Sequence, residues 1–233
     1  MSASKSALEI QNISLRYEER WVLKDLSLTV RAGEFVSLLG ASGSGKSTIL
    51  KAIVGEAPLS KGTIAGPQRY AYAPQRAPLL PWLTVLENLE LARLSNEPME
   101  EFRHRARSML QRAELLDAQN VKAHKLSGGM RGRANVARAF LMIEAQPEVL
   151  LMDEPFIGLD AVTRDLLHSL VLQLWTAKKP ASLFVTHDLD EAIKLSNRVL
   201  VLSKDGSKFT VDQPIDRNVS SSELRAKIYE ALR

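Results

Sequence analysis

The segment from residue 35 to residue 48 constrains the fold of this chain more than any other. Residues 35–39 form a short apolar run, as expected for a strand that is buried on both faces of a sheet. The run leads directly into a glycine-rich loop that begins at Gly40, and residues 48–55 follow as a helical stretch. A glycine-rich loop between a predicted strand and a predicted helix is the context that a phosphate-binding motif requires.

The loop reads Gly-Ala-Ser-Gly-Ser-Gly-Lys-Ser-Thr and matches the pattern G-x-x-x-x-G-K-[ST]. Its glycines let the backbone fold so tightly that successive N–H groups point into one concavity, and the following helix presents its N-terminus to the same anion. Lys46 supplies a positive charge at the β- and γ-phosphates, and Ser47 offers a hydroxyl to Mg²⁺. We therefore predict a site for a nucleoside triphosphate, which leaves transporter ATPases, kinases, GTPases and helicases all open. The predicted nucleotide-binding residues of the loop are Gly40, Ala41, Ser42, Gly43, Ser44, Gly45, Lys46, Ser47 and Thr48.

Composition narrows the class further. The chain of 233 residues contains no cysteine, which excludes a disulfide framework, a thiolate metal site and a cysteine nucleophile. No apolar run approaches the ~18 residues that cross a bilayer, and residues 1–7 lack the apolar region of a secretory signal. If the protein serves a membrane, we expect another chain to do the crossing. The net charge of +4 fits an ordinary solvated surface as well as attraction to phosphates or an anionic membrane.

Strand-like and helix-like stretches alternate along the chain, which predicts a parallel sheet with right-handed crossovers. A strongly helical region, residues 84–116, interrupts the alternation and suggests an inserted helical subdomain. We expect a single domain, residues 1–233, with a core and β subdomain at about 1–80 and 147–233 and a helical subdomain at about 81–146. The other expected strands are residues 8–13, 22–30, 149–152, 182–185 and 199–202, and the other expected helices are residues 129–144, 160–178, 188–195 and 222–232.

Two adjacent acidic residues form the second motif. Four apolar residues, Val-Leu-Leu-Met, precede Asp153 and Glu154. A parallel strand places its last residues at the ligand crevice of an α/β sheet, so Asp153 is positioned to hold Mg²⁺, directly or through water. Glu154 can then polarise an attacking water. Acidic residues at the end of a strand are also common in simple turns, but the phosphate loop favours the metal and water roles.

The third motif is Leu-Ser-Gly-Gly-Met at residues 126–130, which opens a predicted helix. Ser127 is a candidate N-cap, and Gly128 and Gly129 leave backbone N–H groups open to an acceptor. The N-terminus of a helix carries a partial positive charge that favours an anion by roughly 0.3–1 kcal/mol. The motif therefore indicates a second phosphate site, or else a capped helix after a glycine turn.

With these three motifs the sequence resembles the ATP-binding-cassette (ABC) ATPases, whose signature is similar to Leu-Ser-Gly-Gly-Met. The resemblance covers about residues 8 to 205. It implies an α/β fold, a P-loop NTPase with a RecA-like parallel sheet core, an N-terminal antiparallel β subdomain and an inserted helical subdomain. It also implies that the signature of one subunit closes over the triphosphate held by another, so that Ser127, Gly128 and Gly129 bind nucleotide across a dimer.

The resemblance assigns roles to further residues. Tyr17 is similar to the aromatic residue that stacks on adenine, with Trp21 as a weaker candidate because it lies too near the following strand. Gln75 resembles the Q-loop glutamine that senses Mg²⁺ and the attacking water. Asp160, in Gly-Leu-Asp, resembles the D-loop aspartate, and His187 resembles the switch histidine at the γ-phosphate. The resemblance thus implies ATP and Mg²⁺ as cofactors, with Ser47, Gln75 and Asp153 at the metal and Glu154, His187 and Gln75 in catalysis.

The sequence also departs from the family pattern. Gly132 stands where the family usually has glutamine, and residues 139–147 form a longer connection before the strand that ends in Asp153. Neither departure removes a predicted contact to phosphate, Mg²⁺ or water.

The implied function is ATP hydrolysis in an ABC transporter. Residues 79–89 are similar to the corresponding segment of bacterial importers for nitrate, sulfonates and taurine, where the family docks a membrane subunit. The same segment can begin a buried helix, with Thr84 as N-cap and Glu87 completing a capping box. The implied partners are a second nucleotide-binding subunit (a copy or a paralogue), integral-membrane permease subunits and a substrate-binding protein. We expect the protein at the cytoplasmic face of the inner membrane, as a peripheral subunit.

Three other functions fit the sequence less well than ATP hydrolysis in an importer. An ATPase of an ABC exporter is disfavoured by the lack of fused membrane spans. A soluble ABC ATPase acting on nucleic acid or ribosomes would carry a long coiled coil or two cassettes, and about 80 residues between Lys46 and Ser127 leave no room for a coiled coil. We therefore expect no nucleic-acid partner. An unrelated P-loop kinase would leave the signature and His187 unexplained.

Overall fold

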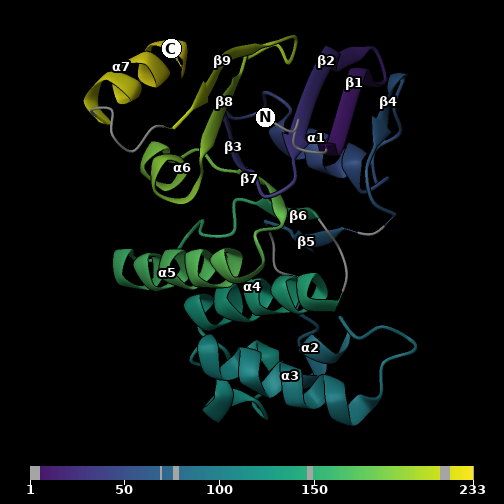
Figure 1. The fold of residues 1–233 in the computed structure, drawn as a ribbon, viewed down its shortest axis with the longest axis vertical. Helices are drawn as coiled ribbons and strands as arrows, with labels where there is room; N and C mark the ends of the chain where they lie inside the picture. Colours follow the sequence, from purple (N-terminus) through teal and green to yellow (C-terminus); the bar gives the residue numbers. More distant parts are fainter. Residues whose placement is uncertain (1–5, 69, 76–78, 146–148, 216–220, 233) are drawn as a thin grey trace. The chain divides into compact units, whose positions relative to one another are not determined.

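A computed structural model describes residues 6–68, 70–75, 79–145, 149–215 and 221–232. The chain divides into two compact units. Unit 1 comprises Met1–Tyr70 and Lys179–Arg233, and unit 2 comprises Ala71–Lys178. Figure 1 labels the elements of both units.

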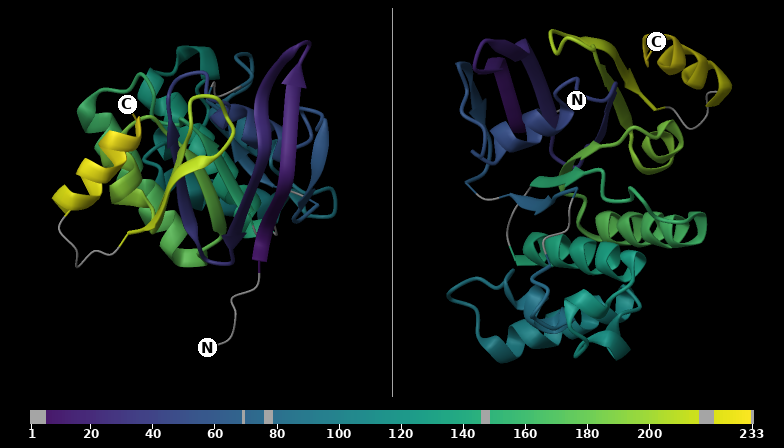
Figure 2. Two further views of the ribbon diagram at one scale, coloured as in Figure 1. Left: turned by 90° about the horizontal axis from the view of Figure 1, so that it is seen from above. Right: turned by 180° about the vertical axis from the view of Figure 1, so that it is seen from behind.

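Unit 1 contains a three-stranded antiparallel sheet in the order β2-β1-β4 (Figure 2). Apolar side chains on β1 and β2, such as Leu8, Leu15, Leu23 and Val30, are fully buried, which is the pattern of a sheet with one face on a core. This sheet confirms the expected N-terminal antiparallel subdomain. Its strands are β1 (Ser6–Tyr17), β2 (Arg20–Arg31) and β4 (Lys61–Ala65).

The second sheet of unit 1 is built around β3, which is buried at every residue. It pairs in parallel with β7 on one edge and with β8 on the other, while β9 is antiparallel to β8. The strands are β3 (Phe35–Gly40), β7 (Ala181–Val185), β8 (Arg198–Leu202) and β9 (Phe209–Pro214), and the helices of the unit are α1 (Lys46–Ile53), α6 (Leu189–Leu195) and α7 (Ser221–Leu232). The predicted strand, loop and helix around the glycine-rich segment are thereby confirmed.

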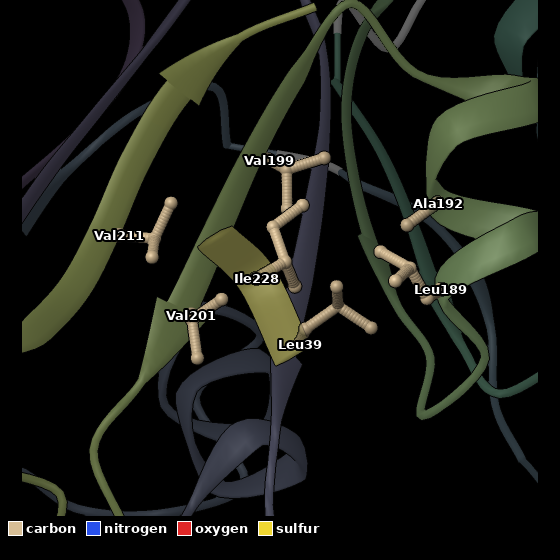
Figure 3. Close-up of a cluster of buried hydrophobic side chains, with 7 residues drawn as sticks. All are labelled: Leu39, Leu189, Ala192, Val199, Val201, Val211 and Ile228. Atoms are coloured by element: carbon tan, nitrogen blue, oxygen red, sulfur yellow. The ribbon is translucent and has the colours of Figure 1, made fainter. Parts of the chain in front are cut away.

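The helix α7 is anchored in unit 1 by Ile228, which is fully buried (Figure 3). Arg225 of α7 also forms an ion pair with Asp190 of α6. The helix therefore covers an apolar patch that extends to Leu39, the residue before Gly40. The buried members of this cluster are Leu39, Leu189, Ala192, Val199, Val201, Val211 and Ile228.

Unit 2 combines two parallel strands with most of the helices. In Figure 1 α4 runs between α5 and α3, in agreement with the contacts of α4 with both. Among the described residues, no helix has both the length and the apolar character that a membrane-crossing segment needs. The elements are β5 (Ala71–Ala73), β6 (Val149–Asp153), α2 (Val85–Glu90), α3 (Met99–Arg112), α4 (Gly128–Ala145), α5 (Ala161–Lys178) and the short 3₁₀ turns η1 (Leu116–Ala118) and η2 (Ala123–Lys125).

The region predicted to be strongly helical, residues 84–116, is divided in the structure. The helix α2 ends at Glu90, and α3 begins only after Pro98. Pro98 has a φ of −59°, but its ψ of 137° lies outside the helical range. Proline disfavours a helical conformation in the residue before it and has no N–H to donate, so it starts a helix more readily than it continues one. The predicted helical region is therefore made of two helices, and residues 91–98 between them are not helical.

The start of α2 confirms the predicted capping box. Thr84 Oγ1 accepts a hydrogen bond from Glu87 N at 3.2 Å, and Glu87 Oε2 accepts one from Thr84 N at 2.7 Å. These bonds hold the pKa of Glu87 below its ordinary value, with the bond from the Thr84 backbone as the main cause. The buried Asn88 amide then joins the turn to Leu80 O and Thr84 O at 3.2 and 2.8 Å.

The lowered pKa of Glu87 predicts a pH dependence of stability. A carboxyl whose pKa is depressed on folding stabilises the native state above its unfolded pKa, and this contribution is lost as pH falls through the folded pKa. Chemical denaturation should therefore show that Glu87→Ala is less stable than the wild type at pH 7, with the difference narrowing under acid. The control is Glu101→Ala, in the first turn of α3, a helix without a side-chain cap. The same pH dependence in both variants would contradict the prediction.

Candidate functional site

The glycine-rich loop of unit 1 has a backbone conformation that two of its glycines make possible. Gly43 and Gly45 have φ values of 77° and 105°, in the region where L side chains are strained. A Cβ at Gly45 would also lie 2.8 Å from Leu23 Cδ2 and 3.2 Å from Val22 O. Space is open around Gly43, where nothing lies within 4 Å of such an atom. Glycine at position 45 is therefore required by both conformation and packing.

The ammonium group of Lys46 is held within the same loop. Its Nζ donates to Gly40 O at 2.9 Å and to Ala41 O at 3.0 Å, and the residue is only 6% exposed. Ser44 is also buried, and its Oγ has no hydrogen-bond partner among the residues that the structure describes. A buried hydroxyl with unused bonding capacity, in the same loop as a lysine ammonium group, suits an anionic oxygen ligand. The fit of a phosphate therefore rests on side chains as well as on the loop backbone.

Two aromatic residues lie at the turn between β1 and β2. Tyr17 pairs with Arg20 and is 50% exposed, while Trp21 pairs with Arg16 and is 39% exposed. The guanidinium carbon of Arg16 lies 5.7 Å from the centroid of the Trp21 ring, within the range of a cation–π contact. Arg16 therefore already occupies one face of Trp21, which supports the preference for Tyr17 as the stacking residue.

The strand β7 ends at Val185, and Thr186 and then His187 follow it. The His187 side chain is exposed, whereas Thr186 is 1% exposed. Thr186 N donates to Leu38 O of β3 at 3.3 Å, so the backbone just before His187 is attached to the strand that carries the glycine-rich loop. The imidazole thus projects from a buried base within unit 1.

Unit 2 brings the two predicted catalytic residues Gln75 and Glu154 near each other. Gln75 Nε2 lies 3.5 Å from Glu154 Oε2, at the outer limit of a hydrogen bond. Asp153, the last residue of β6, is 3% exposed, and Glu154 next to it has a φ of 43°. Such a backbone conformation in a residue other than glycine is uncommon and is often found at functional sites.

The signature segment also lies in unit 2, and its predicted cap is confirmed. Ser127 Oγ accepts a hydrogen bond from Met130 N at 3.2 Å at the start of α4. Gly128 has open space around it, while a Cβ at Gly129 would lie 2.5 Å from Thr163 Cγ2. The first turn of α4 therefore has one open glycine and one that permits close packing.

Asp160 caps the neighbouring helix α5. Its Oδ1 accepts from Thr163 N at 3.0 Å and its Oδ2 from Thr163 Oγ1 at 2.7 Å. These bonds keep the pKa of Asp160 below its ordinary value, with the backbone bond as the main cause. Thr163 thereby connects Asp160 with Gly129, a contact that the sequence motifs alone did not reveal.

Asn135 is a second residue that sequence reasoning missed. It is 3% exposed in α4, and its Nδ2 donates to Pro74 O at 3.3 Å, directly before Gln75. Its position within an apolar stretch, between Ala134 and Val136, is a signal that was available in the sequence. A buried amide there fixes the backbone from which Gln75 projects.

The donors suit Mg²⁺ only together with phosphate. Within the described part of the chain, no group of three or more histidine, cysteine or acidic residues could enclose a metal. Mg²⁺ is usually bound by one or two carboxylates, water and substrate phosphates. The buried carboxylate of Asp153 and the half-buried hydroxyl of Ser47 are donors of that kind.

Comparison with known proteins agrees with this arrangement. The family described as ABC transporter matches residues 23–157. The aliphatic sulfonates import ATP-binding protein SsuB 2 of Streptomyces avermitilis is 38% identical over 236 residues, which cover 98% of this chain and 92% of the relative. The aliphatic sulfonates import ATP-binding protein SsuB 1 of Pseudomonas fluorescens is 37% identical over 233 residues, covering 98% and 87%.

A solved structure is similar as well. It is the dimeric post-hydrolysis state of an ATP-binding cassette bound to ADP and Pi, with 30% identity and a TM-score of 0.79. The match covers 90% of this chain and 99% of that cassette. This likeness confirms the predicted fold class, a P-loop NTPase.

The glycine geometry predicts different outcomes at two positions of the loop. Gly45→Ala should abolish measurable binding of a fluorescent ATP analogue, because its methyl group displaces β2 as well as straining the backbone. Gly43→Ala should bear only the backbone strain, about 1–2 kcal/mol, and should retain binding. Titration of both variants, with a denaturation curve for each, makes the comparison. Wild-type affinity in Gly45→Ala would contradict the packing argument.

Proposed function

Because this chain belongs to the ABC transporter family, we propose that it is the ATP-binding and ATP-hydrolysing subunit of an importer for a small solute. The observation that carries the proposal is the loop around Lys46, whose ammonium group is held by two carbonyls and which also contains the buried Ser44 hydroxyl. A lysine ammonium group in a glycine-rich loop that can exchange its carbonyl partners for phosphate oxygens suits a triphosphate.

Unit 1 supplies the proposed phosphate contacts. Backbone N–H groups of residues 40–48 and the N-terminus of α1 receive the phosphate oxygens. Lys46 exchanges its bonds to Gly40 O and Ala41 O for bonds to phosphate, so its N–H groups have acceptors throughout. Tyr17 stacks on the base, and His187 contacts the terminal phosphate.

Most of the proposed groups for hydrolysis belong to unit 2. Bound Mg²⁺ would neutralise charge on the phosphates, with Ser47, Gln75 and Asp153 as its protein partners. Glu154 accepts a proton from the attacking water, and the amide of Gln75, 3.5 Å from that carboxylate, helps to orient the water. The φ of 43° at Glu154 fixes the direction in which its carboxylate leaves the strand end.

A second nucleotide-binding subunit, either a copy of this chain or a paralogue, completes the proposed assembly. The open N-terminus of α4, with Ser127, Gly128 and Gly129, together with Asp160, would act on the nucleotide held by the other subunit. The dimeric cassette with ADP and Pi supports this arrangement because it is 30% identical to the chain.

The remaining proposed partners are integral-membrane permease subunits and a substrate-binding protein. The names of the relatives favour a solute resembling an aliphatic sulfonate, within the nitrate, sulfonate and taurine class. The proposed position is peripheral, at the cytoplasmic face of the inner membrane. Trp82 is 64% exposed beside the capped start of α2, which suits contact with a permease.

Replacing the proposed base tests the hydrolytic step. Glu154→Gln should lower kcat by about 10²–10⁴-fold and should trap an ATP-bound dimer, because nucleotide still binds but water is not activated. Phosphate release and light scattering after gel filtration measure the two effects. Glu101→Gln, an exposed change on α3, is the control. Wild-type hydrolysis by Glu154→Gln would disprove the role of this residue.

Replacing the exposed tryptophan tests the importer assignment. Trp82→Ala should reduce co-purification with integral-membrane permease subunits, because it removes most of an exposed aromatic anchor. The ATPase activity of the isolated chain should not change. The control is Met99→Ala, an exposed apolar residue on α3. Equal recovery of the permease by wild type and Trp82→Ala would contradict the docking role.

A further inference from the structure

The segment around His187 contains an unusual helix cap. Asp188 is the N-cap of α6, and its Oδ1 accepts from Asp190 N at 2.8 Å and Glu191 N at 3.2 Å. In an ordinary capping box the acidic residue at the third helical position would accept from the N-cap backbone N–H. Here Asp188 N donates instead to Thr186 Oγ1 at 3.0 Å, and Thr186 Oγ1 donates to Glu191 Oε2 at 2.5 Å. The Thr186 hydroxyl is thus inserted between the two halves of the box.

The same chain provides the ordinary arrangement for comparison. At the start of α2, Glu87 Oε2 accepts directly from Thr84 N at 2.7 Å, and no hydroxyl intervenes. That box is exposed, whereas Thr186 and Glu191 are 1% and 6% exposed. The inserted hydroxyl therefore belongs to a buried hydrogen-bond chain, where a lost partner leaves a polar group unsatisfied.

This hydrogen-bond chain encloses the backbone of His187 on both sides. Thr186 precedes the histidine and is attached to β3 through the bond from its N to Leu38 O. Asp188 follows the histidine and is attached back to Thr186 through its own N–H. The imidazole is exposed, but the peptide units that carry it are fixed to a buried hydroxyl and a buried carboxylate.

The carboxylate of Glu191 is itself fixed by the packing of α6. Leu189 and Ala192, its neighbours in α6, belong to the apolar cluster that Ile228 closes (Figure 3). Asp190 adds the ion pair with Arg225 of α7. The core of unit 1 therefore determines the position of Glu191. The hydrogen bond between Glu191 and the Thr186 hydroxyl in turn fixes Thr186, the residue directly before His187.

We propose that Thr186 and Glu191 are positioning residues that hold His187 in the orientation needed at the terminal phosphate. The inference rests on the proposed function, because it assumes the role of His187 in ATP hydrolysis. Neither residue touches the nucleotide. Their effect is confined to the step that needs the imidazole, and nucleotides without a γ-phosphate bind independently of them.

The test compares Thr186→Val, which keeps the shape of the side chain but removes the hydroxyl, with Thr186→Ser, which keeps the hydroxyl but removes the methyl group. Thr186→Val should lower kcat by about ten- to a hundred-fold, the cost of misplacing a reacting group, while the Kd for ADP is unchanged. Thr186→Ser should recover most of the turnover. Thr84→Val removes a cap hydroxyl from the exposed box of unit 2 and should lower the thermal midpoint without lowering kcat.

Three results for the Thr186 variants would overturn the inference. The first is unchanged kcat in Thr186→Val, and the second is a parallel loss of kcat and ADP affinity, which would indicate general damage. The third is failure of Thr186→Ser to restore turnover. A His187→Ala variant separates the premise from the inference. Full turnover in His187→Ala overturns the role of the histidine and the inference with it, whereas a defect there with normal turnover in Thr186→Val overturns the inference alone.

Discussion

The pairing of β3 on both edges is the constraint on which the chemistry of unit 1 depends. A strand that bonds to β7 and β8 and is buried at every residue has no freedom to shift its register without exposing apolar side chains. Because β3 and β7 are parallel, their carboxyl ends lie at the same edge of the sheet. The glycine-rich loop leaves the carboxyl end of β3, and Thr186 and His187 leave the carboxyl end of β7. A single pairing therefore brings the phosphate loop and the histidine to one side of the unit.

Polar groups in both units are arranged to direct side chains that the core cannot hold by packing. In unit 1 the carbonyls of Gly40 and Ala41 direct the Lys46 ammonium, and the Thr186 hydroxyl fixes the base of His187. In unit 2 Asn135 fixes the backbone before Gln75. Each of these supports is buried or nearly so, and an unpaired polar group in that position is costly. The proposed functional side chains are thus positioned by a second layer of hydrogen bonds.

Local signals in the sequence were sufficient for the elements with a strong pattern. The strand and loop around Gly40, the capping box at Thr84 and the cap at Ser127 each depend on residues within a few positions of one another. The strands β4, β5 and β9 were not predicted, because they are short or largely exposed and owe their conformation to pairing with a neighbour. The division of residues 84–116 was available from Pro98. The insertion of Thr186 into the hydrogen-bond chain was not, since Thr186 lies outside the capping-box pair of Asp188 and Glu191.

The burial of Ile228 against Leu39 has a consequence for synthesis. The patch beside the glycine-rich loop is closed by a side chain that the ribosome adds long after the loop itself has emerged. At typical elongation rates the interval is roughly 10 to 40 seconds. During that time the nascent chain carries an incomplete apolar surface next to the glycine-rich loop. We expect holdase chaperones or early nucleotide binding to affect its folding most strongly in this interval.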